Sequence, residues 1–163
     1  MKIETLRELF VEELQDLYSA ENQIVEALPK LAKKAANQQL KQALEALLKE
    51  TKQQVERLER IFESIEEEPE GKTCEGMKGL IKEGELIIKA SGEPEVIDTG
   101  IISATQRVEH YEISGYGTVR TYAELLGEDG AVRLLDETLQ EEKAAEQKLN
   151  KIASSINMEA QAA

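Results

Sequence analysis

Apolar residues recur every three or four positions through four long stretches of the sequence, which is the spacing of one face of an α-helix. This spacing predicts helices over about residues 3–35, 38–65, 94–126 and 130–156. No stretch combines alternation of apolar and polar residues with β-branched side chains, so we expect no strands. Residues 74–90 form a shorter amphipathic segment between the second and third stretches, and they predict one further helix of about 15 residues.

Turn signals indicate how these helices connect. The AANQQ cluster around Asn37 and the GEDG sequence at 127–130 predict tight turns, whereas roughly 30 residues separate the second long helix from the third. At about 1.5 Å per helical residue, that connection can return along the whole bundle. The pattern predicts an all-α, ferritin-like antiparallel four-helix bundle with a short extra helix in a long crossover. We expect one domain over residues 1–157 and a frayed tail over 158–163.

Charge and composition exclude several classes of function. Acidic residues outnumber Lys and Arg by 33 to 20, and the resulting net charge of −13 argues against nucleic acid or an anionic membrane surface as a partner. A membrane helix needs about 20 apolar residues, and the longest stretch without a charge is residues 99–106. Glu4 and Glu8 stand where a signal peptide would be apolar, and Cys74 is the single cysteine. We therefore expect a cytoplasmic protein without disulfides.

Each apolar stripe is interrupted by acidic or amide side chains at positions where its spacing calls for an apolar residue. The interrupting residues are Glu21, Glu50, Gln54, Glu109, Glu112, Glu142 and Glu146. Counted from the two turns, Glu21 lies level with Glu50 to within roughly 5 Å, and Glu112 lies level with Glu142 to the same tolerance. We therefore expect these side chains to meet in one layer of the bundle.

A layer of ionised carboxylates in an apolar core needs protons or cations to neutralise it, because each buried charge costs several kcal/mol. Two divalent cations would use the carboxylate oxygens as ligands, an arrangement known in dimetal four-helix bundles. Oxygen-rich ligation favours hard ions, so we expect iron first and manganese second, ahead of zinc or copper. Tyr18 and Tyr116 lie about one turn from Glu21 and Glu112, where their hydroxyls could hold these ligands in place.

Other features leave alternatives open. Protonated acids and hydrogen bonds would also neutralise the layer, which would make the chain a metal-free structural or partner-binding bundle with a vestigial acid cluster. Gln53 or Gln54 stands at the place where dimetal helices often carry a histidine, and the only histidine, His110, points about 100° away from Glu109 around the helix. Gly115 and Gly117, inside a helix, favour close packing against a neighbour over a π-bulge.

Four blocks of the sequence resemble the bacterial YciF-type stress-response family. These blocks are AENQIVEALPKL, ETKQQVERLERIF, RVEHYEISGYGTVRTYAELLG and LLDETLQEEKAAEQKL. The family is ferritin-like and similar in fold to rubrerythrins and other di-iron proteins. The resemblance implies metal roles for the seven residues that interrupt the stripes. It also implies iron oxidation or chemistry with O2 or peroxide, as in a di-iron oxidase, ferroxidase or peroxidase-like protein. We further expect a homodimer formed through apolar residues of the crossover.

Overall fold

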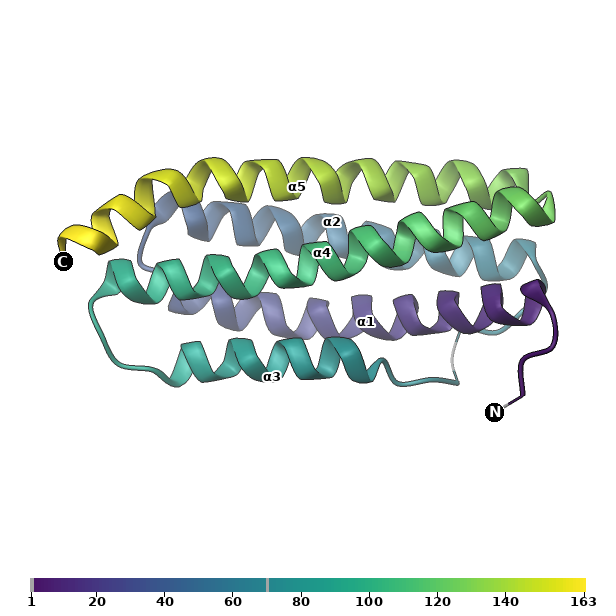
Figure 1. The fold of residues 1–163 in the computed structure, drawn as a ribbon, viewed down its shortest axis with the longest axis horizontal. Helices are drawn as coiled ribbons and strands as arrows, with labels where there is room; N and C mark the ends of the chain where they lie inside the picture. Colours follow the sequence, from purple (N-terminus) through teal and green to yellow (C-terminus); the bar gives the residue numbers. More distant parts are fainter. Residues whose placement is uncertain (1, 70) are drawn as a thin grey trace.

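The computed structural model describes residues 2–69 and 71–163, and over these ranges the chain forms five helices and no strand (Figure 1). The helices are α1 (Leu6–Lys34), α2 (Gln38–Ser64), α3 (Glu75–Lys89), α4 (Pro94–Leu126) and α5 (Asp129–Ala162). The all-α class and the predicted helix ranges are confirmed, except at the C-terminal end. There α5 continues to Ala162 instead of ending near residue 156. The expected frayed tail is helical because Met, Glu, Ala and Gln are strong helix formers.

The helices pack as two antiparallel pairs. α1 packs against α2, α4 packs against α5, and the pairs meet through α1 with α4 and α2 with α5 (Figure 1). The long connection after α2 returns along the bundle and carries α3, which packs on the outside against α1 and α4. This arrangement is the ferritin-like bundle with a helix in its crossover that the turn signals predict.

Local hydrogen bonds fix both tight turns. The Asn37 side chain caps α2 by accepting hydrogen bonds from the backbone N–H groups of its first turn. Gly127 ends α4 with a φ of 75°, a left-handed conformation that favours glycine. The buried carboxylate of Asp98 on α4 accepts from the backbone N–H groups of Ala36 at 2.9 Å and Asn37 at 2.6 Å. Asp98 thereby joins the α1–α2 turn to the second helix pair.

The core consists of two apolar clusters with a polar layer between them. The first cluster includes Ile24, Leu44 and Leu149, and the second includes Leu14 and Leu58. Along α2, α4 and α5, buried polar residues separate the side chains of one cluster from those of the other, and on α1 Glu21 lies at the same boundary, next to Ala20 of the first cluster. The interruptions predicted from the sequence therefore fall in the middle of the bundle.

Gly115 on α4 lets α1 approach closely. A Cβ atom built on Gly115 would lie only 2.7 Å from Cδ2 of Leu17, whereas one built on Gly117 would meet no described atom within 4 Å. α4 is α-helical through both residues, so no π-bulge forms there. Close packing thus explains Gly115, which lies against the side chain of Leu17 and not against another backbone. It does not explain Gly117.

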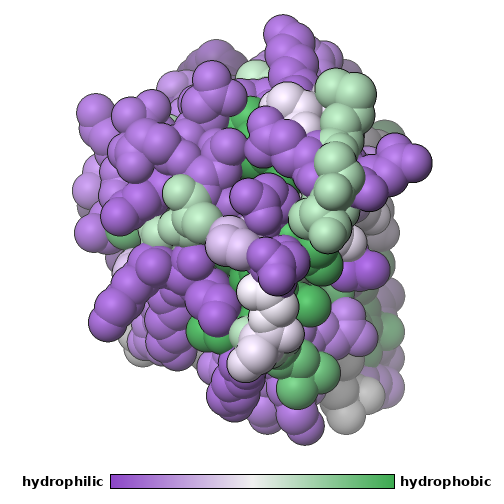
Figure 2. Space-filling model, turned by 90° about the vertical axis from the view of Figure 1, so that its left-hand side faces the viewer, coloured by the Kyte–Doolittle hydropathy of each residue, from purple (hydrophilic) through white to green (hydrophobic). Residues whose placement is uncertain are grey.

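Within the described residues, none of the helices has both the length and the apolar character required to span a bilayer. Hydrophilic side chains cover most of the end of the bundle where α3 is followed by α4 and where the C-terminus lies, but apolar surface also gathers there (Figure 2). The large apolar side chains that are exposed include Leu86, Val96 and Met158.

Candidate metal centre

Five polar side chains from all four long helices fill the layer between the two apolar clusters. They are Glu21 from α1, Gln54 from α2, Glu109 and Glu112 from α4, and Glu142 from α5. None of these residues is more than 3 % exposed. The i, i+3 spacing within α4 directs two carboxylates to the same face of that helix. The layer expected from helix spacing and height therefore forms, with these five residues inside it.

The carboxylates approach one another closely. Glu109, Glu112 and Glu142 each offer one carboxylate oxygen, and these three oxygens all lie within 4.8 Å of one another. Glu21 is near enough to Glu112, and Glu109 near enough to Glu142, for each pair to share a proton in a hydrogen bond. Oxygens at such separations can bind a common cation, which is the chemistry that the sequence pattern predicts.

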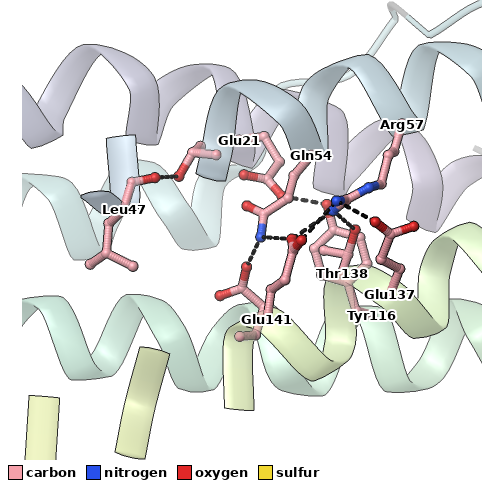
Figure 3. Close-up of polar contacts among 10 residues, drawn as sticks. Glu21, Leu47, Gln54, Arg57, Tyr116, Glu137, Thr138 and Glu141 are labelled. Carbon is pink, nitrogen blue, oxygen red and sulfur yellow. Dashed lines mark hydrogen bonds and ion pairs between the residues drawn. The ribbon is translucent and has the colours of Figure 1, made fainter. Parts of the chain in front are cut away.

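Two neutral side chains donate hydrogen bonds to the layer. The hydroxyl of Tyr116, itself fully buried, donates to Oε1 of Glu21. The Gln54 amide donates to Oε1 of Glu142 at 2.5 Å and to Oε2 of Glu141 at 3.2 Å (Figure 3). Tyr116 thus contacts a candidate ligand, but that ligand is Glu21 on α1 and not Glu112, which lies one turn away from Tyr116 on α4. Gln54 was predicted as a ligand, but in this arrangement it orients Glu142 through its N–H group.

An ion-pair network supports Gln54 from the surface side. Arg57 on α2 binds both oxygens of Glu141 on α5, at 2.6 Å and 2.7 Å, and also binds Glu137 at 2.8 Å (Figure 3). The Arg57 side chain is only 11 % exposed, so this bidentate contact is largely shielded from water. The sequence analysis missed Arg57 and Glu141. In the sequence, Arg57 is marked only by its position about one turn after Gln54, and Glu141 only by its position next to Glu142.

Four buried carboxylate oxygens have no hydrogen-bond donor among the described residues. They are Oε2 of Glu21, Oε2 of Glu109, Oε1 of Glu112 and Oε2 of Glu146. A buried polar atom without a partner is unfavourable, and several such atoms on like-charged groups are more so. A divalent cation would bind these oxygens directly, and an all-oxygen donor set suits a hard ion. The residues present therefore fit a metal ion of the kind predicted.

The electrostatics of the layer point to the same need for neutralisation. Burial and, to a lesser extent, the charge on Glu142 raise the pKa of Glu21 to about 8, against the opposing effect of hydrogen bonds from Tyr116 and Glu112. Burial also raises the pKa of Glu142 to about 7, against the opposing effect of hydrogen bonds from Glu109 and Gln54. Burial and neighbouring carboxylates hold the pKa values of Glu109 and Glu112 well above the ordinary range. Near neutral pH the layer must hold protons or cations.

Two of the predicted ligands lie at the edge of this layer. Glu50 is half-buried in a cavity of about 160 Å³ between α2 and α5, beside Glu141 and Lys148. The inward positions of α2 are taken by Thr51 and Gln54, so Glu50 has the predicted height but lies at the edge of this face, about 100° around the helix from Thr51. Glu146 has a side chain that is 14 % exposed and contributes a buried oxygen from the α4–α5 side.

Tyr18 has a different partner from the one its sequence position suggests. Its hydroxyl donates to Oε1 of Glu59 on α2 at 3.1 Å, which is an exposed contact. This bond ties α1 to α2 and does not position a residue of the buried layer. Tyr18 also packs edge-on against Phe62, with ring centroids 6.2 Å apart.

A small apolar pocket reaches the layer from the crossover side. It has a volume of about 30 Å³, lies between α1, α3 and α4, and includes Glu109 in its lining. Most of the other lining residues are aliphatic, among them Ile24, Leu80 and Val108. The pocket is therefore suited to a small apolar molecule next to a candidate ligand.

The topology and the buried carboxylates together define a ferritin-like four-helix bundle with an acidic centre. The chain belongs to the DUF892 family, described as a domain of unknown function, whose model matches residues 5–162. It is 43 % identical over 163 residues to the protein YciF of Escherichia coli strain K12, covering 99 % of this chain and 98 % of that one. The resemblance to the YciF-type family is thereby confirmed.

Solved structures agree with this assignment. The crystal structure of YciF, named there as an E. coli stress protein, has a TM-score of 0.92 at 43 % identity and covers 94 % of this chain and 98 % of its own. YcfI from Rhodopseudomonas palustris, labelled a candidate structural protein, has a TM-score of 0.87 at 44 % identity, covering 91 % and 95 %. A Xanthomonas campestris protein matches at 21 % identity with a TM-score of 0.76 over 94 % of each chain, which supports the fold alone.

Proposed function

We propose that the buried layer binds two divalent metal ions, iron in preference to manganese, and that this stress-family protein oxidises iron or acts on O2 or peroxide. The observation that carries the proposal is the set of four buried carboxylate oxygens for which the described residues offer no hydrogen-bond donor. The stress-protein name of the E. coli relative supports a role under stress.

The residues of the layer have distinct roles in this proposal. Glu21, Glu109, Glu112 and Glu142 would hold the ions through their carboxylate oxygens, with Glu146 at the edge. Bound iron would supply one-electron redox chemistry with O2 or peroxide. The raised pKa values of Glu21 and Glu142 mean that these groups release protons when a cation binds.

The surroundings of the layer serve binding and orientation. The Tyr116 hydroxyl and the Gln54 amide hold Glu21 and Glu142 in place before a cation arrives. The apolar pocket beside Glu109 would admit O2, an apolar molecule, without admitting much water. The apolar surface at the α3–α4 end is where we place the contact of a homodimer.

A second candidate function is a metal-free structural bundle. It is favoured by the two close carboxyl pairs, each of which could share one proton, and by the structural label given to the R. palustris relative. In that case the acids would be vestigial and protonated. The two candidates make opposite predictions about metal content and about the effect of a chelator.

Metal content and thermal unfolding distinguish the candidates. After loading with Fe(II) or Mn(II) and desalting, we expect about two ions per chain by elemental analysis. Metal at 100 times its dissociation constant should add about 2.7 kcal/mol to the free energy of unfolding. Glu112→Gln should reduce both effects, whereas Glu83→Gln, at an exposed position on α3, should change neither. Fewer than about 0.2 ions per chain and no chelator effect would reject the metal centre, since dimetal bundles bind two.

Activity needs a separate measurement. The absorbance of oxidised iron is followed after Fe(II) is added to the loaded protein in air, with the Glu112→Gln variant and buffer alone as controls. A rate above both controls supports oxidation at the layer. A rate equal to that of buffer, in a protein that retains its ions, would leave a metal-binding protein and reject the oxidase.

A further inference from the structure

The only histidine of the sequence, His110 on α4, lies at the surface beside Glu146 on α5. Its Nε2 atom is 3.2 Å from Oε1 of Glu146, and the side chains of His110 and Glu146 are 65 % and 14 % exposed. We propose that His110 and Glu146 form an outer site where a divalent transition-metal ion binds before it reaches the buried carboxylates. This inference rests on the proposed function of the buried layer.

Glu146 connects the surface to the layer because its two oxygens have different surroundings. Oε1 faces outward and accepts hydrogen bonds from Gln106 at 3.3 Å and Asn150 at 3.0 Å, next to His110. Oε2 is buried and has no hydrogen-bond donor in the described part of the chain. The charge of Glu146 contributes to the raised pKa of Glu109, which places the two carboxylates within electrostatic reach.

Glu109 provides the inner end of the path. It is 3 % exposed, and its Oε2 atom, like that of Glu146, is buried without a donor among the described residues. An ion held by His110 and Glu146 would therefore find the next unpartnered carboxylate on the same helix as His110, one residue away in sequence.

The geometry of the pair suits a metal ion as well as a hydrogen bond. Ligand nitrogen and oxygen atoms lie about 2.0–2.2 Å from Zn²⁺ or a similar ion, so at an angle near 100° the two atoms would be roughly 3.2 Å apart. The observed separation of 3.2 Å between Nε2 and Oε1 matches this value. An imidazole with a carboxylate selects transition-metal ions over Mg²⁺ or Ca²⁺, which prefer oxygen ligands.

Two cavities described above suit a cation less well than the His110–Glu146 pair does. The cavity between α2 and α5 includes the Lys148 side chain in its lining, and the Glu141 carboxylate there is already paired with Arg57. Their positive charges oppose an incoming cation. The pocket between α1, α3 and α4 is lined mostly by aliphatic side chains, which would strip water from an ion without replacing it.

The single histidine makes the outer site directly observable by NMR. In ¹⁵N-histidine-labelled protein, titration with Zn²⁺, a diamagnetic ion, should shift the Nε2 resonance of His110 through direct coordination. Glu146→Gln should raise the Zn²⁺ concentration needed for this shift by about tenfold or more. Asp136→Asn is the matched control because it removes another α5 acid that pairs with a basic residue of α4, Arg120. We expect this control to titrate like the unmodified protein.

The loading rate tests whether the outer site comes first. His110→Gln should slow Mn²⁺ uptake, followed by stopped flow with a competing indicator, by about tenfold while the final stoichiometry stays the same. An Nε2 resonance that does not move, or a variant that loads at the unmodified rate, would overturn the inference. If elemental analysis finds about two bound ions per chain while the Nε2 resonance of His110 does not move, only the proposed outer site is rejected. If the His110 resonance shifts but Glu112→Gln leaves metal content unchanged, the proposed function of the layer fails instead.

Discussion

The metal-free protein should lose stability as the pH rises from 5.5 to 7.0. Glu21, with a pKa of about 8, and Glu142, with a pKa of about 7, keep protons when folded, but a glutamate in the unfolded chain has released its proton by pH 5.5. A carboxyl group whose pKa is raised by folding contributes full stability only below the unfolded value near 4.5, and that contribution is lost as the pH rises through the folded value. The unfolded state therefore becomes favoured with increasing pH.

The size of the loss follows from the proton difference. Each proton kept only by the folded state changes the free energy of unfolding by about 1.4 kcal/mol per pH unit. Over the interval of 1.5 pH units, Glu21 alone should account for about 2 kcal/mol, and Glu142 for somewhat less. Because these two groups are coupled, we expect about 2–4 kcal/mol from them, or roughly 4–16 °C in Tm for a domain of this size. Glu109 and Glu112, whose pKa values are also raised by folding, add a further loss of the same sign.

The assay is urea unfolding followed by circular dichroism, in chelator, at several pH values between 5.5 and 7.0. The double variant Glu21→Gln and Glu142→Gln should show a flatter dependence because these two groups no longer titrate, and Glu109 and Glu112 should account for the slope that remains. With Mn²⁺ in place of chelator, the dependence should reverse, since the cation displaces the protons and binds more tightly at higher pH. A free energy of unfolding that stays constant or rises with pH in chelator would refute the electrostatic account of the layer.

Two further predictions concern the frame that holds the layer. Gly115→Ala should be less stable than Gly117→Ala by about 1–3 kcal/mol in urea unfolding, because both gain the helix propensity of alanine but only the first forces a Cβ atom against Leu17. Equal stabilities would contradict the close packing. Asp98→Ala should lower the free energy of unfolding by about 2–4 kcal/mol, because it leaves the backbone N–H groups of residues 36–37 without their charged acceptor. Asp98→Asn, which keeps one acceptor oxygen, should lose less.

Most of the fold could be predicted from the sequence because helix periodicity and turn chemistry act locally. Each stripe determines which side of a helix faces the core, and the turns at Asn37 and Gly127 set the heights of the acids along the bundle. These two quantities were enough to predict a common layer. They were also enough to place Glu21, Glu112 and Glu142 inside it.

The errors arose where angular position or side-chain reach decides the contact. Glu50 has the right height, but the inward face of α2 centres on Thr51, which a stripe interrupted by several polar residues does not reveal. The side chain of His110 leaves α4 about 100° around the helix from that of Glu109, yet it is long enough to reach Glu146 on α5. The contacts of Arg57 with Glu141 depend on how α2 packs against α5, and no local pattern encodes that packing.

The position of the layer bears on why it exists at all. It divides what would otherwise be one continuous apolar core. Its carboxylates raise one another's pKa values because they lie next to other acids instead of next to basic side chains. In a bundle with a purely structural role, apolar side chains of similar volume at Glu109, Glu112 and Glu142 would pack at least as well and would remove the repulsion. A selected role for the acids therefore requires a ligand that makes them favourable. If a variant with all three replaced by Leu or Met is more stable than the chelated protein but less stable than the metal-loaded one, stability was given up for binding. A replacement variant that is less stable than the chelated protein would show that the protonated network itself holds the bundle together.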